Sequence, residues 1–360
     1  SASENFDRAA DAARGTYFLL IADDEILIPE ALSSVKALLE ATDAPIIRFA
    51  CNAYYYYPNS LSNGDGNLLR IDPFTGDAWR VKAADVLEVL FNLDCFVGDK
   101  HSLHYAARPL PLGARTVTRK DLYEKIKSRV GAFHSPEPMY SSAVYLLNEV
   151  DEVLVCDRHL CLGCVLPDSP SRAGEFLRDP TTGWDKETID GFYKDFTAPV
   201  DVRSTVCSYQ TSGILVAQRL VSPDLDDYAI SLKNYAARMV RELYTLHEKS
   251  IDVADDIRAM QILMDANGLR DDFMYHFDRF RRWKPRYLGY CLRRKIEHMR
   301  SAADEDQVVW KRLYRGDMHG FEDVLGCLAQ YEKIANTITN RSYPQDLLRK
   351  FYPDCIQLEI

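Results

Sequence analysis

Three consecutive acidic side chains follow an apolar run near the start of the chain. The stretch RGTYFLLIADDEILIPEAL leads directly from that run into Asp23, Asp24 and Glu25. Neighbouring carboxylates repel one another unless a cation lies between them. One acid close to the helix that Pro29 opens would favour the dipole of that helix, but capping does not need three. Mg²⁺ and Mn²⁺ prefer oxygen ligands and often take one or two carboxylates plus substrate phosphates. The alternatives are therefore a helix cap and a metal–diphosphate site.

Alternating helices and strands position these acids in the predicted fold. Residues 5–15 and 29–42 have helical spacing, whereas residues 16–22 and 44–57 are apolar runs typical of buried strands. This alternation predicts an α/β sheet. Ligands of such sheets bind beyond the carboxyl ends of the strands, which is where the acids fall.

The later segments divide the chain into three parts. Residues 1–166 form the predicted α/β domain, which includes an amphipathic helix ended by Gly131 and a strand over 152–164. Residues 167–206 lose periodicity and are rich in Pro, Ser, Gly and Asp, as expected of a loop or linker. Residues 207–360 have mostly helical patterns and predict a helical C-terminal domain.

Composition limits the class of protein. The 360 residues are 47% hydrophobic and carry a net charge of -10, which argues against a nucleic-acid partner. No apolar run approaches the roughly 18 residues that span a bilayer, so any membrane contact is expected to be peripheral. Nine cysteines, an odd number, predict reduced core thiols of a cytoplasmic protein. Cys161 and Cys164 form a C-x-x-C, but no second pair at matching spacing supports a zinc site.

The order of these motifs resembles the inverting GT-A glycosyltransferases of family 2. In NFDRAADAARGTYFLLIADDEILIPEAL an Asn, a helix, Ala-x-Gly-x-Tyr, an apolar strand, Asp-Asp and Pro follow one another as in that family. The likeness continues through IIRFACNAYYYYP, RKDLYEKIKSRVGAFHSPEPMYSSAVYLL and VLVCDRHLCLGCVLPDSPS, and so covers about residues 4–172. The resemblance implies a GT-A-like, truncated Rossmann-like mixed sheet flanked by helices.

The resemblance also implies transfer of a sugar from a nucleoside-diphosphate donor to an acceptor hydroxyl, with inversion at the anomeric carbon. Asp24 of the DXD-like motif would hold Mn²⁺ or Mg²⁺, and Asp23 would contact the ribose or assist at the metal. The cation would stabilise charge on the leaving diphosphate. Glu25 stands where family members vary, so its implied role is secondary. A glycan or a lipid-linked acceptor of polysaccharide or glycoconjugate synthesis would receive the sugar.

The first departure from the family concerns the donor site. Family members begin with nucleotide-binding strands upstream of the segment that opens this chain. A sheet without those strands would expose an edge that another chain could cover. We therefore expect a missing N-terminal segment or a partner chain to complete the donor site.

The second departure concerns the catalytic base. Family members carry an acid where this chain has Met139, and a thioether accepts no proton at neutral pH. Glu137, two residues earlier, is the first candidate to take the proton of the acceptor hydroxyl; the alternative is a solvated loop acid. His134, with an ordinary pKa close to neutral, is the second candidate, as a base or as an acceptor-binding residue.

Further candidates are basic or aromatic. Arg172 follows a Pro- and Ser-rich loop and could clamp the diphosphate with its guanidinium group. The stretch 278–300 has nine Lys or Arg against two acids. A solvated face is the leading interpretation, and the alternative is contact of 279–300 with anionic lipid at the inner membrane face. Tyr54 to Tyr57 could stack on a sugar, but alternation of core and surface along a strand is the favoured interpretation.

Two other functions compete with the glycosyltransferase. A catalytically impaired GT-A-like binding or scaffolding protein would account for Met139 and for the absent nucleotide-binding strands. A nucleotidyltransferase also uses paired acids and Mg²⁺, but it usually has a Gly- and Arg/Lys-rich phosphate loop, and this sequence has none.

Overall fold

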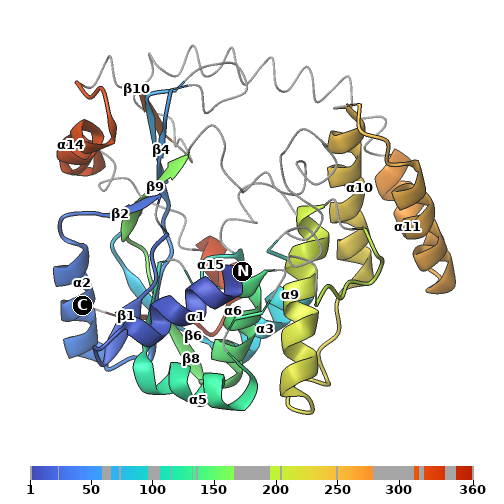
Figure 1. Cartoon of the computed structure of the whole chain (residues 1–360), viewed down its shortest axis with the longest axis horizontal. Helices are drawn as coiled ribbons and strands as arrows, with labels where there is room; N and C mark the ends of the chain where they lie inside the picture. Colours follow the sequence, from blue (N-terminus) through green and yellow to red (C-terminus); the bar gives the residue numbers. More distant parts are fainter. Residues whose placement is uncertain are drawn as a thin grey trace.

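The computed structural model describes residues 2–22, 24–58, 66–72, 74–95, 106–113, 115–131, 133–134, 137–165, 195–202, 205–248, 250–278, 312–315, 320–336 and 346–358. These residues form a mixed α/β fold in which helices flank two sheets (Figure 1). The labelled helices are α1 (Ala2–Ala12), α2 (Ala31–Thr42), α3 (Ala83–Phe91), α5 (Lys120–Val130), α6 (Pro138–Asn148), α9 (Val206–Val221), α10 (Leu232–Glu248), α11 (Ala254–Ala266), α14 (Val324–Asn336) and α15 (Asp346–Phe351). The predicted α/β class is therefore confirmed.

The larger sheet has the strand order β1-β7-β3-β8-β6-β11. Only β3 and β8 pair in parallel, so the sheet is mixed. Its strands are β1 (Tyr17–Leu19), β3 (Ile46–Phe49), β6 (Ala78–Lys82), β7 (Thr116–Arg119), β8 (Glu152–Cys156) and β11 (Ile356–Leu358). Within the described residues β1 is bonded to β7 alone, which makes it an edge of this sheet.

The smaller sheet has the order β10-β5-β4-β9-β2. Here β4 and β9 run parallel and the other pairs are antiparallel. Its strands are β2 (Glu25–Leu27), β4 (Ala53–Tyr56), β5 (Leu68–Ile71), β9 (Cys161–Val165) and β10 (Arg312–Arg315). The sequence analysis predicted neither β10 nor β11, and each adds a late segment of the chain to a sheet formed by earlier residues.

Two segments predicted as single strands each cross from one sheet to the other. Residues 44–57 divide into β3 and β4, and residues 152–164 divide into β8 and β9. Because β3 pairs with β8 and β4 pairs with β9, both crossings occur at the same level. Asp157 and Cys51 meet there, with the Cys51 Sγ donating to Asp157 Oδ1 at 2.9 Å. The crossing is therefore a polar point inside the fold.

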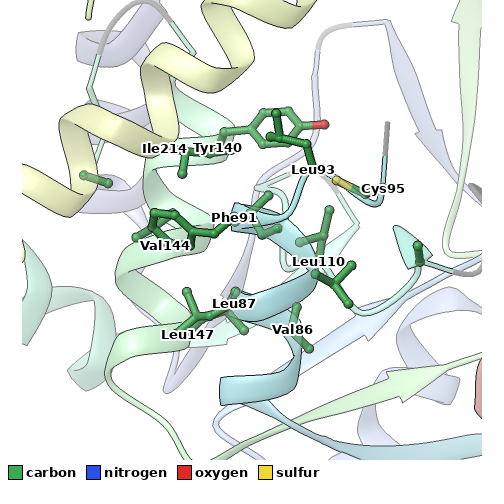
Figure 2. Packing of buried hydrophobic residues seen from close by; sticks show 14 of the residues in the cluster. Val86, Leu87, Phe91, Leu93, Cys95, Leu110, Tyr140, Val144, Leu147 and Ile214 are labelled. Carbon is green, nitrogen blue, oxygen red and sulfur yellow. The ribbon is translucent and has the colours of Figure 1, made fainter. Parts of the chain in front are cut away.

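Helices from both halves of the chain share the main hydrophobic core. Side chains of α3 and α6 pack against Ile214 of α9 (Figure 2). The labelled members are Val86, Leu87, Phe91, Leu93, Cys95, Leu110, Tyr140, Val144, Leu147 and Ile214. Apolar contacts thus cross the predicted boundary at residue 207, and the division into domains stays a prediction.

A second core lies between α14 and one face of the smaller sheet. Tyr55, Leu69 and Leu162 pack there with Phe321 and Tyr331. Tyr55 is fully buried, whereas Tyr54 and Tyr56 are half-buried, so the predicted alternation along the tyrosine run is confirmed. The opposite face of this sheet carries polar and aromatic side chains.

The described helices include none that is long and apolar enough to span a membrane. The described cysteines are all buried and free of disulfides. Cys161 and Cys164 lie three residues apart on β9, so their side chains point to opposite faces of the strand. Shared ligation of one ion by this pair would require β9 to change shape.

Candidate functional site

The acidic stretch forms a turn between β1 and β2. The Glu25 amide donates to the Ala22 carbonyl at 3.1 Å, and the Ala22 amide donates to Glu25 Oε2 at 3.2 Å. The half-buried Asp24 lies inside this turn, where its carbonyl accepts from the Cys164 amide at 2.7 Å. Asp23 lies outside the described residues. We call Ala22, Asp24 and Glu25 the acidic turn.

A buried arginine supplies the positive charge beside the acidic turn. Arg115 Nη2 donates to Glu25 Oε1 at 3.2 Å, and the two side chains are only 10% and 8% exposed. The Nε of Arg115 donates to Cys161 Sγ at 3.3 Å. Burial by itself would lower the pKa of this guanidinium, but Tyr54, Cys161 and Glu25 raise the pKa above its ordinary value. Arg115 is therefore charged at neutral pH and offsets one of the acids.

The polar face of the smaller sheet seats this arginine. Glu25, Gly163, Tyr54 and Arg70 lie directly opposite one another on β2, β9, β4 and β5, so they share a face. A Cβ on Gly163 would come within 2.9 Å of the Tyr54 ring and 3.3 Å of Arg115 Nη2. The absence of a side chain at Gly163 thus makes room for both groups.

The Tyr54 ring already binds two cations. The guanidinium carbons of Arg70 and Arg115 lie 5.3 Å and 5.1 Å from its centroid, within cation–π range. Arg70 also donates to the Tyr56 hydroxyl at 3.1 Å and pairs with Asp72 at 3.7 Å. These contacts give Tyr54 a role in holding arginines, while the sugar-stacking alternative stays a prediction.

The candidate base Glu137 lies at the start of α6. Its side chain is half-buried, and within the described part of the chain no cation pairs with it. Burial raises the pKa of this carboxyl to about 7, although the Met139 amide acts in the opposite direction. A carboxyl with this pKa changes protonation near neutral pH, which suits a general base.

The second candidate base, His134, is held by a tyrosine. The Tyr145 hydroxyl lies 2.9 Å from His134 Nδ1, and the His134 amide donates to Ser141 Oγ at 3.0 Å. Burial lowers the pKa of His134, while the carboxylates of Asp195 and Asp7 raise it by a smaller amount. A ring fixed by Tyr145 is less able to approach an acceptor, so the geometry favours Glu137.

One short segment connects the two parts of the candidate site. Met139, two residues after Glu137, has its Cγ 3.8 Å from the position of a Cβ on Gly113. Arg115, two residues after Gly113, reaches Glu25 of the acidic turn. Met139 of α6 therefore lies close to Gly113, and Glu25 of the acidic turn contacts Arg115. Arg172 and residues 279–300 lie outside the described residues, so their roles stay predictions.

The donor set fits a cation only together with further ligands. Among the described residues no group of three or more His, Cys, Asp or Glu could hold a metal ion. Both oxygens of Glu25 are engaged by Arg115 and the Ala22 amide. One or two carboxylates plus phosphates are a common set for Mg²⁺, and the described residues of the turn do not by themselves supply a metal site.

Three residues that shape the site carried no sequence signal of their own role. Arg115 and Gly163 act through contacts far apart in the sequence. Gly213 of α9 lies so close to α6 that a Cβ would come 2.7 Å from the Glu137 carbonyl oxygen and 3.2 Å from its Cβ. The one sequence sign of this close approach of α9 to α6 is the group of small residues in QTSGILV, within a helix.

Gly213→Ala is expected to lower the rate of any reaction that uses Glu137 by about 10- to 100-fold, because a displaced base loses its alignment. The contacted atom is backbone, so Glu137 must shift to accommodate the methyl group. The control is Gly326→Ala in α14, where the nearest atom belongs to the Asp323 side chain at 3.3 Å. Steady-state kinetics of both variants measures the effect, and equal rates would contradict it.

Comparison with known proteins adds no relative. No protein-family model matches the chain, and no curated protein sequence matches it. The function is therefore argued from the residues of the site.

Proposed function

We propose that the protein is a metal-dependent inverting glycosyltransferase that moves a sugar from a nucleoside diphosphate to an acceptor hydroxyl. The observation that carries the proposal is the half-buried Glu137, whose pKa is raised to about 7 at the start of α6. It lies two residues from the position at which the resemblance places the base. The nearness of Met139 to Gly113 and the pairing of Arg115 with Glu25, two residues apart along the chain, support placing both in one site.

Each residue has a defined task in this proposal. Glu137 takes the proton of the acceptor hydroxyl as the oxygen attacks the anomeric carbon. Asp24, with Asp23 from the sequence motif, holds Mn²⁺ or Mg²⁺, which when bound stabilises charge on the leaving diphosphate. Arg172 is the proposed diphosphate clamp. The glycan or lipid-linked acceptor, the contact of 279–300 with lipid and the cytoplasmic location are proposals from the sequence alone.

The nucleotide-binding half of the donor site is proposed to come from elsewhere. Within the described residues β1 is an unprotected edge of the larger sheet, with half-buried side chains. An unpaired edge is a template for a further strand. A strand of a partner chain could pair with this edge and supply the base-reading residues.

Metal-dependent nucleotide binding tests the donor site. We expect UDP, GDP or dTDP to raise the unfolding temperature only when Mn²⁺ is present, and Asp24→Ala to abolish the shift. A ligand at about 100 times its Kd contributes about 2.7 kcal/mol to stability. The control is Asp151→Ala, which removes an exposed turn acid that also precedes a strand. A metal-independent shift, or one that survives Asp24→Ala, would overturn this part of the proposal.

Met139 favours the second candidate, a GT-A-like binding or scaffolding protein without transfer activity. Its thioether stands where the family resemblance places an acid, and it packs near Gly113 instead of facing an ionic partner. Metal-dependent nucleotide binding combined with no turnover of nucleotide-sugars, in wild type and Glu137→Gln alike, would select this candidate.

A further inference from the structure

We propose that His159 is an acid-sensitive contact: α14 stays packed on the smaller sheet while the ring of His159 is neutral, and protonation of the ring releases the helix. The inference concerns the response of the fold to pH and does not depend on whether the chain transfers a sugar. It gives a role to a buried titratable side chain that the candidate site does not use.

His159 lies between β8 and β9, where the chain crosses from the larger sheet to the smaller one. The residue is only 3% exposed. Its ring contacts two aromatic rings edge to face: the Phe74 centroid lies 4.8 Å away at an interplanar angle of 79°, and the Tyr331 centroid lies 5.9 Å away at 88°. Because Tyr331 belongs to α14, the histidine joins this helix to the crossing of the two sheets.

The helix α14 covers the apolar face of the smaller sheet (Figure 1). Cys327, Tyr331 and Ile334 of the helix belong to the second core together with Tyr55 of β4. A helix takes part in no strand ladder, so α14 can leave this face while both sheets stay intact, as a locally unfolding unit. We call the arrangement in which Tyr331 packs on His159 the docked state, and the arrangement without this contact the released state.

Both ring nitrogens of His159 are buried, and none of the described residues forms a hydrogen bond with either of them. A neutral imidazole has one N–H donor and one acceptor nitrogen, whereas the protonated ring has two donors and a positive charge. An unpaired buried polar group costs stability, and an unpaired buried charge costs more. Water would bond to both nitrogens in the released state. The neutral ring is therefore tolerated in the docked state, while the charged ring favours release.

Charged groups from several elements surround the ring. Burial lowers the pKa of His159 to about 4, although the carboxylates of Asp72 after β5 and Asp157 after β8 raise it; Arg115 ahead of β7 acts with burial. The Asp72 backbone also faces the ring, outside hydrogen-bonding geometry, and the adjacent Arg158 is exposed. Both carboxylates already pair with arginines, which limits the stabilisation that they give a further cation.

The titratable groups of α14 act differently. Glu332 and Lys333, which follow Tyr331, are exposed. Glu30, ahead of α2, raises the pKa of Glu332. Protonation of one of these two carboxyls removes their repulsion, so this pair holds α14 more firmly in acid, with a sign opposite to that of His159. The contribution of His159 is therefore the difference between the wild type and a variant that lacks the imidazole.

The pH range of the response follows from the two states of the ring. A hydrated histidine has a pKa of about 6.5, whereas the docked ring has a pKa of about 4. The docked state thus binds fewer protons, so its stability is fully present above pH 6.5 and is lost as pH falls from 6.5 toward 4. Between pH 7.5 and pH 5.0 the ratio of released to docked molecules should rise about 25-fold through this ring.

Amide hydrogen exchange of the full chain at pH 7.5 and pH 5.0 tests the inference, with the rates corrected for the intrinsic pH dependence of exchange. Protection of the α14 amides measures the released fraction and should fall about 25-fold in the wild type. The amides of α3, which packs in the main core, should change by less than about threefold. An equal fall in α14 and α3 would indicate global unfolding and would overturn the release of α14.

His159→Phe assigns the response to this ring, because phenylalanine can pack on the same two aromatic rings but takes up no proton. Protection of α14 in this variant should change by less than about threefold between the two pH values. The matched control is His247→Phe, which changes an exposed histidine of α10 and should lose α14 protection as the wild type does. Equal losses in the wild type and His159→Phe would contradict the role of His159.

Carbon-13 NMR of the histidine rings in the wild type decides the question if His159→Phe does not fold. The ring signal of His159 is recognised by its nuclear Overhauser contacts with Phe74 and Tyr331, which lie against it. Its titration midpoint should lie below about pH 5, as expected of a ring that the docked state keeps neutral. A midpoint near 6.5 with α14 still protected would show that the charged ring is accommodated in the docked state, and would overturn the inference.

Discussion

Glu137→Gln is expected to lower the rate of sugar transfer by about 10²- to 10⁴-fold, the usual contribution of a positioned general base. Glutamine keeps the shape of the side chain but cannot accept the proton of the acceptor hydroxyl. Because Glu137 directly precedes α6 and does not belong to the acidic turn, metal-dependent nucleotide binding should stay unchanged. Transfer assays and calorimetry on the same preparation separate these two effects.

The control for this substitution is Glu124→Gln, which changes an exposed acid on α5. Its transfer rate should equal that of the wild type. A Glu137→Gln variant with more than about a tenth of the wild-type rate would fall outside the range of a general base. That result would move the assignment to His134 or to the non-catalytic candidate.

The pH dependence of the wild type follows from the pKa of Glu137. The ionised carboxylate is the active form of the base, and burial raises its pKa to about 7. The kcat/KM should therefore rise as pH passes through about 7 and level off about one pH unit above the pKa, where the carboxylate is almost fully ionised. A profile that is flat between pH 6 and 8 would contradict the role of this carboxyl.

The same burial has a consequence for stability that needs no substrate. A carboxyl whose folded pKa lies above its unfolded value stabilises the fold fully below the unfolded pKa, and this contribution is lost as pH rises through the folded pKa. The shift from 4.5 to about 7 limits the effect to about 3 kcal/mol. The free energy of unfolding of Glu137→Gln, minus that of the wild type, should therefore be larger at pH 8 than at pH 5. Urea unfolding at the two pH values measures it, and an equal difference at both would indicate an ordinary carboxyl.

Local sequence signals predicted the elements around the site well. The helix expected to end at Gly131 is α5, which ends at Val130 with Gly131 at a φ of 78°. The helix opened by Pro29 begins at Ala31. Both boundaries depend on residues within one or two turns of the helix, where Pro and Gly restrict or free the backbone. The mixed α/β class follows from such segments.

Contacts between distant residues were not predictable in the same way. The strand expected over 16–22 is shorter, because β1 covers Tyr17–Leu19 and the chain then turns into β2. The pairing of Arg115 with Glu25 joins residues 90 apart in the sequence. An arginine in the stretch LGARTV looks like any surface arginine, because its burial is decided by Gly163 and Tyr54 on strands that only the fold brings together. The apolar pattern likewise gave no sign that two long strands change sheets.

Asp157→Ala is expected to lower the free energy of unfolding by about 3–5 kcal/mol, the cost of removing one partner from a buried ion pair. Asp157 is fully buried where β8 ends, and it pairs with Arg108, which is only 2% exposed. It also accepts from the Thr75 amide at 2.8 Å, the Thr75 hydroxyl at 2.9 Å and the Cys51 thiol. Urea unfolding at neutral pH measures the loss.

The control lies at the other end of β8. Glu152→Ala removes the partner of Arg80 from a pair whose side chains are 34% and 37% exposed, and exposed pairs contribute about 0–1 kcal/mol. A loss of less than about 1 kcal/mol in Asp157→Ala would mean that water or neighbouring groups compensate Arg108 as they would at the surface. Asp157→Asn keeps one acceptor oxygen and should fall between the two variants.

The position of Asp157 explains why so many bonds converge on it. Both long strands leave the larger sheet at this level and enter the smaller one, so their peptide groups cannot all pair along a single ladder. Asp157 bonds to Cys51 on one crossing and to Thr75 ahead of β6. Its loss should therefore loosen the smaller sheet relative to the larger one. The acidic turn is more than 20 residues away in the sequence from Cys51 and Thr75, which bond to Asp157. Because Glu25 and Gly163 lie on the smaller sheet, Asp157→Ala should nevertheless weaken nucleotide binding at the acidic turn. Glu152→Ala should leave that binding unchanged.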